Sequence, residues 1–381
     1  MRALHTLRRR AGSILVLTAM MMVLMFAMLA VAVDLGYMAL VRTQLQSSAD
    51  AAALAATWDL ISGDGLSTPG NAVPELALAR ATAEQFAGLN HVSGVAPTLA
   101  DTDVAFGRFQ YSSGGAILNF DNPSAYNATR VRVRRAVGQN GEVPMFFVRV
   151  LGINSCPGQA EATAAFCDNF SGFKPPATGT GNLAILPFAL DKQTWDALMA
   201  GQSTSDQSAW NAETGQIASG ADGLAEVNLY PQGTGSPGNR GTIDIGNNNN
   251  STADISRQIR EGVSEADLAQ LGGKLELGPD GTLQLNGDTG ISAGVKDDLL
   301  AIRGQPRVIP LFTSVSGPGN SAQYTIVGFV GVRIMEVNLT GPMSSKRVLI
   351  QPARVEMLGG IPATDGVQHS YFLHSPVWLV K

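Results

Sequence analysis

Few residues of this 381-residue chain have side chains that could carry out chemistry. The sequence contains four histidines and two cysteines, and 15% of its residues are charged. A serine hydrolase needs a histidine beside its nucleophile, and no histidine lies in or near a Gly-x-Ser-x-Gly motif. Adjacent carboxylates such as Asp297 and Asp298 are more typical of exposed charge than of an acid–base pair. We therefore expect no enzymatic activity, no cofactor and no metal site.

The two cysteines, Cys156 and Cys167, lie eleven positions apart without a nearby histidine. This spacing differs from that of a zinc site or a redox-active Cys-x-x-Cys motif. In an oxidising compartment, two cysteines most simply form one disulfide, and closing that loop would stabilise the fold by about 3 kcal/mol. We predict this disulfide, with a pair of free thiols as the alternative.

The element that must position the rest of the chain is an uncharged run near the N-terminus. Residues 13–33 carry no charge, and at 1.5 Å per residue they span about 31 Å, the thickness of a bilayer's hydrocarbon core. Basic residues before such a run hold that end in the cytoplasm, so we expect residues 34–381 to lie outside it. The sequence thus predicts a cytoplasmic segment, 1–12, and a single transmembrane helix, 13–33. The basic residues are Arg2, Arg8, Arg9 and Arg10.

A cleaved signal peptide is the alternative interpretation of the same run. Ala30-Val31-Ala32 has the small-x-small form that a signal peptidase prefers. A retained anchor is favoured because the run is longer than a usual signal-peptide core and because the helical pattern continues beyond the cleavage position. Both interpretations export residues 34–381.

Beyond the apolar run, the helical pattern continues to about residue 58. Apolar and small residues recur at steps of three and four, which is typical of an amphipathic helix. Alanines spaced four apart would let a second backbone approach closely. This alanine stripe has two possible partners, another subunit or the protein's own sheet. The candidate residues of this membrane-exit and assembly helix are Asp34, Gly36, Leu45, Gln46, Ala49, Asp50, Ala52, Ala53 and Ala56.

Residues 8–60 combine an arginine-rich start, an Asp34-x-Gly36 step and the run "LQSSADAAALAA". With these motifs, the segment resembles the N-terminal part of TadE/TadG-like proteins of tight-adherence (Flp) pilus assembly. This resemblance implies a bacterial inner-membrane protein that is a non-enzymatic, pilin-like component of a Tad/Flp pilus or a related envelope secretion system. It also implies that other subunits bind the alanine-rich helix. Gly12 lacks the glutamate that a prepilin cleavage site carries five residues on, because Leu17 stands there.

The exported part divides at "KPPATGTG", residues 174–181, a proline- and glycine-rich linker. Before it, we expect a pilin-like α+β domain, 34–173, with a second amphipathic helix at 73–90 and strands at 104–111, 129–137 and 145–151. After it, we expect a β-rich domain, 182–381, with strands at 307–312, 324–339 and 347–357. The middle strand is apolar on both faces and should be central, and Gly328 and Gly331 within it indicate a bulge or a close crossing. The predicted fold class is α+β.

The arginines of strand 129–137 do not indicate a nucleic-acid site. Arg130, Arg132 and Arg134 alternate with valine or threonine, as on a solvated strand face. Nucleic-acid binding needs a wide basic surface, whereas the chain after the apolar run has 22 basic and 31 acidic residues. The sequence leaves the oligomeric state open. Two further functions stay possible, a surface adhesion or binding module on the same anchor and a secreted hydrolase behind a signal peptide.

Overall fold

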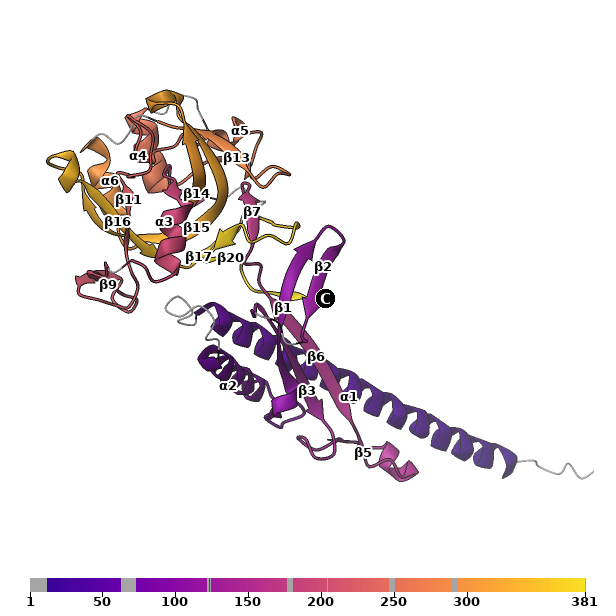
Figure 1. Cartoon of the computed structure of the whole chain (residues 1–381). Helices are drawn as coiled ribbons and strands as arrows, with labels where there is room; N and C mark the ends of the chain where they lie inside the picture. Colours follow the sequence, from indigo (N-terminus) through magenta and orange to yellow (C-terminus); the bar gives the residue numbers. More distant parts are fainter. Residues whose placement is uncertain are drawn as a thin grey trace, which may run out of the picture.

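The computed structural model has a long helix that projects as a rod from a body built from two groups of strands (Figure 1). The first group lies along the helix, and the second forms a head beyond the C-terminal end of the helix. The predicted α+β fold, with a long N-terminal helix followed by antiparallel sheets, is confirmed. The structure describes residues 12–62, 73–121, 123, 125–176, 181–203, 205–246, 251–288 and 293–380.

The rod is a single helix, α1, which spans Gly12–Ser62 and contains 51 residues. It begins at the start of the uncharged run and continues through the alanine-rich segment, as the periodicity predicts. Among the described residues, α1 is the one helix long and apolar enough to cross a membrane. Most of the predicted cytoplasmic segment, residues 1–11 with the four arginines, lies outside the described residues.

A five-stranded antiparallel sheet packs against the second half of α1, with strand order β2-β1-β3-β6-β21 in the described chain. The second amphipathic helix that the sequence predicts is α2, which packs beside α1 on the same sheet. The two helices and the inner face of the sheet share one hydrophobic core. The bounds are Val73–Leu89 for α2, Val104–Ser112 for β1, Gly115–Asn119 for β2, Ala128–Arg135 for β3, Gly158–Ala165 for β6 and Trp378–Val380 for β21.

The predicted strand at 145–151 is wrong. These residues form the tip of a hairpin whose stem is the antiparallel pair of β4, Val143–Pro144, and β5, Ser155–Cys156. The tip contains a 3-10 helix, η2, which spans Val148–Leu151. Gly152 ends η2 with a φ of 87°, a left-handed conformation that glycine adopts without a steric cost. The alternation of valines that indicates a strand is therefore overridden by contacts of the hairpin with α1.

The head is organised around β15, which spans Gln323–Asn338 and is buried along most of its length. This confirms the prediction that the long apolar run is a central strand. It pairs antiparallel with β13, β14 and β16 and parallel with β19, and hydrophobic cores lie on both of its faces. The other strands of this sheet are β8 (Leu190–Asp191), β11 (Val227–Tyr230), β13 (Leu283–Asn286), β14 (Pro306–Ser316), β16 (Arg347–Pro352) and β19 (Ser370–Tyr371).

Two glycines of β15 allow another segment to cross it closely. A Cβ atom on Gly328 would lie 2.5 Å from the carbonyl oxygen of His369, and one on Gly331 would lie 2.3 Å from that of Ala353. Both distances are shorter than any side chain tolerates, so only glycine lets the backbones approach. The close crossing predicted at these glycines is confirmed.

Smaller elements complete the head. In the described chain the head also contains four helices and three short sheets. The helices are α3 (Lys192–Met199), α4 (Thr252–Glu261), α5 (Glu265–Ala269) and α6 (Lys296–Ala301). The strands are β7 (Phe170–Phe173), β9 (Ser208–Asn211), β10 (Gln216–Ser219), β12 (Leu275–Glu276), β17 (Val355–Glu356), β18 (Gly360–Pro362) and β20 (Leu373–His374).

Two short strands cross the predicted domain boundary at 174–181. β7 precedes the boundary but pairs with β12 and β18 of the head. β21, at the end of the chain, returns to pair with β6 of the sheet along α1. Residues 177–180 of the predicted linker lie outside the described residues. The division into two domains, 34–173 and 182–381, stays a prediction. The pairing of β7 and β21 across the boundary connects the two parts.

Candidate functional site: the exit of the long helix

The alanine stripe of α1 is buried within its own chain. Val41 and Ser48 lie in the same buried row, and the stripe faces α2, β3 and β6. Of the two partners that the sequence leaves open for this stripe, the described structure has the protein's own sheet, together with α2, in contact with it. The predicted residues with no exposed surface are Leu45, Ala49, Ala52, Ala53 and Ala56.

Small residues are needed on this face because the backbones come very close. The hydroxyl of Ser48 donates to the carbonyl oxygen of Ala87 in α2 over 3.1 Å. On the sheet side, the hydroxyl of Thr57 donates to the carbonyl oxygen of Ala164 over 3.3 Å. Such short side chains reach across only when the two backbones approach closely. The facing residues of α2 are also alanines without exposed surface, namely Ala79, Ala83 and Ala87.

Gln46 and Asp50 lie at the edge of this interface. The amide nitrogen of Gln46 donates to the carboxylate of Asp50 over 2.7 Å and to the carbonyl oxygen of Glu161 over 3.3 Å. They therefore fasten α1 to the strand β6. Gly36, in contrast, is exposed, and no atom lies within 4 Å of where its Cβ would be. Nothing in the described structure explains a glycine at this position.

Asp34 joins the helix to the hairpin of β4 and β5. One oxygen of its carboxylate accepts a hydrogen bond from the backbone amide of Phe146 over 3.0 Å. The other accepts from the amides of Phe147 and Val148 over 2.9 and 2.7 Å. The side chain is 3% exposed although it follows the apolar run directly. The ring of Tyr37, one helical turn further on, packs edge-on against the ring of Phe146 with centroids 4.9 Å apart.

These hydrogen bonds keep the carboxylate of Asp34 ionised. Burial acts to raise the pKa of Asp34, but the three backbone amides outweigh this effect and lower the pKa below its ordinary value. The resemblance indicated Asp34 as a candidate residue, but the sequence did not predict its partners. These are backbone amides, which nearly every residue has and which no residue type identifies. The apolar string from Met145 to Ile153, broken by the single charge of Arg149, is the signal that could have indicated an unusual loop.

The predicted disulfide between Cys156 and Cys167 is wrong, because both cysteines are free. The extended strand β6 separates them, and eight residues in a strand span about 26 Å. A disulfide requires Cα atoms within about 7 Å. Burial raises the pKa of Cys167 to about 11, so this side chain stays a neutral thiol. The alternative, two free thiols, describes the structure.

An apolar groove lies on the outer side of α1, where α1, α2 and the end of the head meet. Its volume is about 740 Å³. Trp58 is 49% exposed and Phe86 is 39% exposed, so both present large apolar surfaces. Sequence reasoning missed this groove, although Leu54 and Trp58 stand four residues apart on one helix face. The lining residues are Ala51, Leu54, Ala55, Trp58, Asp59, Thr82, Phe86, Glu356, Pro376 and Val377.

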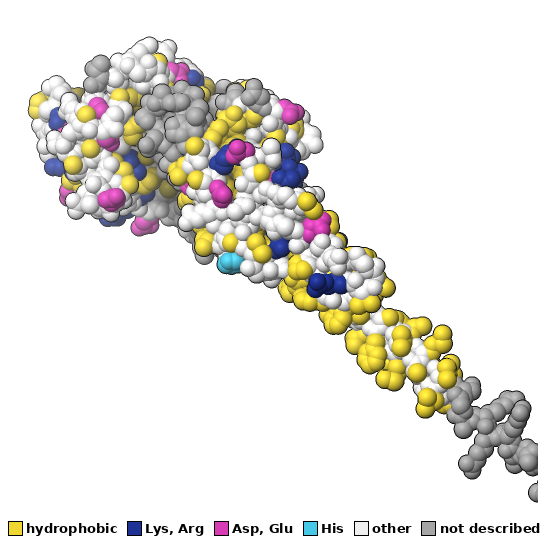
Figure 2. Space-filling model, turned by 90° about the horizontal axis from the view of Figure 1, so that it is seen from below, with side chains coloured by type: hydrophobic (Ala, Val, Ile, Leu, Met, Phe, Trp, Pro, Cys, Tyr) yellow, Lys and Arg dark blue, Asp and Glu magenta, His cyan; other side chains and the backbone are white. Residues whose placement is uncertain are grey.

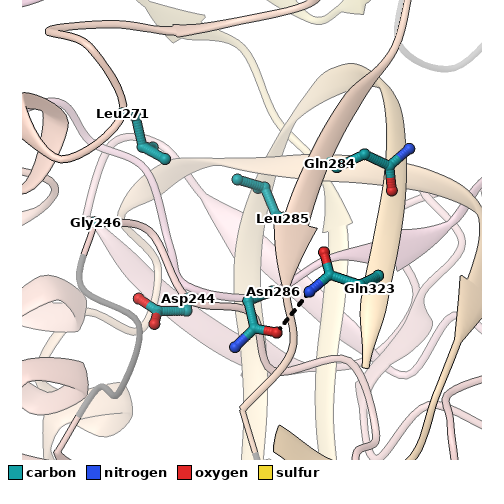
Figure 3. Close-up of a pocket in the computed structure, with 7 residues that line it drawn as sticks. All are labelled: Asp244, Gly246, Leu271, Gln284, Leu285, Asn286 and Gln323. Carbon is teal, nitrogen blue, oxygen red and sulfur yellow. Dashed lines mark hydrogen bonds between the residues drawn. The ribbon is translucent and has the colours of Figure 1, made fainter. Parts of the chain in front are cut away.

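A second hollow, in the head, is polar. It has a volume of about 410 Å³, and Asp244 lines it together with Asn286 and Gln323 (Figure 3). Asp244 is 6% exposed, and its Oδ1 atom has no hydrogen-bond partner in the described structure. Burial, and then the neighbouring carboxylates, raise the pKa of Asp244 to about 7. These neighbours are Asp288, Asp254 and Asp267.

The arginines of β3 are held by acidic residues. Arg132 and Arg134 both contact one oxygen of Asp103, at 3.5 and 2.6 Å. Arg130 lies 3.9 Å from Glu161 and stacks on the ring of Phe120. The described residues contain no group of three or more histidine, cysteine, aspartate and glutamate side chains that could hold a metal ion.

Comparison with protein families supports the resemblance seen in the sequence. Residues 12–59 match the family described as Flp pilus-assembly TadE/G-like. Residues 55–164 match a second family, described as Tad-like Flp pilus-assembly. The two matches meet at the alanine-rich part of α1 and end within β6, so they cover the rod and most of its sheet. No curated protein and no solved structure matches the chain.

The first prediction concerns the junction at Asp34, that is, the hydrogen bonds by which its carboxylate joins α1 to the hairpin of β4 and β5. Replacing Asp34 with alanine removes the acceptor of three backbone amides, so the amides of Phe146, Phe147 and Val148 should exchange with solvent about tenfold faster. Hydrogen exchange of the full-length protein in detergent measures this rate. Asp50→Ala is the matched control, because Asp50 is a carboxylate of the same helix that accepts from the Gln46 side chain. Unchanged exchange in Asp34→Ala would contradict the junction.

The carboxyl of Asp244 generates a prediction on pH. Because its pKa is raised to about 7 in the folded chain, the folded state holds a proton that the unfolded state has lost, and stability falls as pH rises from 4 to 7. Asp244→Asn should remove this decline and stabilise the protein by about 2 kcal/mol at pH 8, after allowance for solvent screening. Urea unfolding of the full chain between pH 4 and 8 measures the effect.

The control for Asp244 is Asp196→Asn, which alters an exposed carboxylate paired with Lys192 four residues away. It should change stability by less than about 0.5 kcal/mol. A pH profile of Asp244→Asn parallel to that of the unaltered protein would show that Asp244 titrates at its ordinary pKa.

Proposed function

We propose that this chain, whose residues 12–164 match two families of Tad-like Flp pilus assembly, is a membrane-anchored structural or assembly component of such a pilus. A related envelope secretion system is included in this proposal. The component has no catalytic activity of its own. Its work is to hold an exported body at a fixed place on the membrane and to present a surface to neighbouring subunits.

One observation carries this proposal, the contrast between the two halves of α1. None of the most apolar window of the helix is buried within the described structure, and side chains such as Leu15 and Met20 are more than two thirds exposed. Figure 2 shows hydrophobic side chains along the projecting rod on the face that is seen. In water this surface would be strongly unfavourable, whereas lipid covers it at no cost. The other half is buried along one face by α2 and the sheet, so one helix serves two environments.

We propose that the anchor lies in the bacterial inner membrane with a cytoplasmic N-terminus. The arginines at positions 2, 8, 9 and 10 support this orientation, because basic residues are retained on the cytoplasmic side. Residues 34–381 then lie outside the cytoplasm. The continuity of α1 from Gly12 to Ser62 supports a retained anchor, because the helix does not end near the cleavage position after Ala32.

We propose that other subunits of the pilus system bind the outer side of α1 at the apolar groove. The alanine stripe is already covered by α2 and the sheet, so it offers no surface. Leu54, Ala55 and Trp58 lie on the accessible side of the same helix, and Phe86 adds a second aromatic ring from α2. Partly exposed aromatic residues in an apolar groove are typical of protein contacts.

A tethered binding module is the second candidate function. The observation that favours it is the polar hollow of the head, about 410 Å³ in volume, which is lined by Asp244, a carboxylate whose buried Oδ1 atom has no hydrogen-bond partner among the described residues. A ligand with hydrogen-bond donors would fit such a site. Asn286 and Gln323, which hydrogen-bond to each other over 2.9 Å, would supply further polar atoms.

Anchoring is tested by fractionation of cells that produce the full chain. The protein should stay in the membrane fraction after alkaline washing, and N-terminal sequencing should find a start before residue 13, because the apolar half of α1 is retained in lipid. A soluble product that begins at Val33 would instead identify a cleaved signal peptide and would refute the anchor.

Assembly is tested by a photo-crosslinking amino acid placed at Ala55 in the groove, in cells that contain the whole pilus system. We expect an adduct with another subunit of that system, because the groove is the accessible apolar face of α1. The matched control is Thr43, an exposed position of α1 outside the groove. Equal yields at both positions, or adducts at Thr43 alone, would exclude the groove as the contact.

A further inference from the structure

The hairpin tip beside the rod has an unusual surface for an exported protein. We name residues 145–154 the exit loop, because they lie where α1 leaves its uncharged run. The stem of β4 and β5 holds the loop, and the amide of Met145 donates to the carbonyl oxygen of Asn154 over 3.0 Å. Arg149 is the single charged residue of the loop, and the sequence places no acidic residue in it.

Five large apolar side chains of the exit loop are exposed, whereas Met145 at its start is buried in the core beside α1. Val150 is 91% exposed and Leu151 is 72% exposed, and three further large side chains are at least half exposed. Nothing in the described part of the chain covers them. Clusters of this kind on a soluble surface mark contact with another apolar phase. The three further residues are Phe146, Phe147 and Ile153.

The depth of the loop along α1 is fixed by contacts that the structure defines. Asp34 binds the amides of Phe146, Phe147 and Val148, and the ring of Tyr37 packs on that of Phe146. Asp34 is also the first charged residue after the uncharged run 13–33. The loop is therefore held at the level where a bilayer spanned by that run would end. Figure 2 shows hydrophobic surface continuing from the rod onto the adjoining end of the body.

We propose that the exit loop is a second membrane contact, which dips into the outer leaflet of the same bilayer that α1 spans. Its occupant is the headgroup and upper acyl region of phospholipid. The inference rests on the proposed anchoring of residues 13–33. Val150, Leu151 and Ile153 enter the acyl boundary, and the guanidinium of Arg149 stays among the phosphates, as the long side chains of interfacial segments do.

The chemistry of the loop suits lipid better than a protein partner. Its one cation matches the anionic headgroups of a bacterial membrane, and no carboxylate opposes them. Two carboxylates lie close to the loop, and both are held by the protein: that of Asp34 accepts three backbone amides, and that of Glu142 accepts the hydroxyl of Ser155. The continuity of the loop with the transmembrane half of α1 places lipid, rather than a further subunit, against it.

Two contacts at one level have a mechanical consequence. A single helix can rotate about its axis and tilt in the bilayer. A loop fastened to its side through Asp34 and inserted in the leaflet restricts both motions. The exit loop thus sets the orientation of the body on the membrane, and with it the direction in which the groove at Trp58 faces.

The test measures the surroundings of single fluorophores on the full chain in vesicles of phosphatidylethanolamine and phosphatidylglycerol. In a background with Cys156→Ala and Cys167→Ala, an environment-sensitive dye is attached to Val150→Cys. Leu24→Cys, within the anchor, reports anchoring, and Val367→Cys, an exposed apolar position of the head, is the control outside the membrane. Lipids with a nitroxide high or low on the acyl chain, and aqueous iodide, are the quenchers.

We expect the dye at residue 150 to be quenched by the shallow nitroxide to about half the extent that the deep one achieves at residue 24, and to be protected from iodide. The dye at residue 367 should be quenched by iodide alone. Ile153→Cys provides a second reporter in the exit loop and should behave as residue 150 does.

Each other outcome refutes a defined claim. If the dye at residue 24 is quenched by lipid but those at residues 150 and 153 respond to iodide, the anchor stands and the second contact is refuted. If residues 150 and 153 respond to neither quencher, protein covers the loop and the lipid contact is likewise refuted. If residue 24 itself responds to iodide, the proposed anchor fails, and the exit loop fails with it.

Discussion

The close packing of the second half of α1 against α2 and the sheet is the contact on which the rest of the molecule depends. It is possible only because alanines without exposed surface face one another, so that Ser48 of α1 reaches the backbone of α2 at Ala87. This packing holds half of a 51-residue helix rigidly in protein and leaves the other half projecting. Bulky side chains on this face of α1 would separate the helix from α2 and the strands, and the close packing would be lost.

The packing of α1 on the sheet also fixes the position of Asp34, at the point where the helix leaves the body. Because α1 is fixed against β3 and β6, Asp34 stands at a constant height beside the hairpin of β4 and β5, and its carboxylate can gather three backbone amides. The same fixation leaves the opposite side of the helix, at Leu54 and Trp58, open in an apolar groove. The proposed anchor, the proposed subunit contact and the exit loop thus belong to one rigid element.

The head is joined to this element by more than a linker. β21 adds to the edge of the sheet along α1, and β7 adds to the head from the other side of residues 174–181. Covering an edge strand also removes a row of unpaired backbone groups. Within the head, the glycines at positions 328 and 331 let a returning segment cross β15, which brings the chain back towards β21. The position of the head relative to the membrane therefore depends on backbone pairing as well as on covalent connection.

The sequence alone determined the elements whose signal is local. The uncharged run, the alanine periodicity and the doubly apolar strand at 324–339 predict α1 and β15, because burial and helix periodicity follow directly from residue type. The motifs of residues 8–60 also predicted the Tad-like character that the family matches support. Only the tertiary structure decided which surface the alanine stripe contacts, because an alanine face fits a neighbouring subunit as well as the protein's own sheet. It likewise decided that Cys156 and Cys167 stay apart, since their separation depends on β6 being extended. It also decided that residues 145–151 form the tip of a hairpin, since Asp34, which accepts the amides of Phe146, Phe147 and Val148, stands more than a hundred positions away.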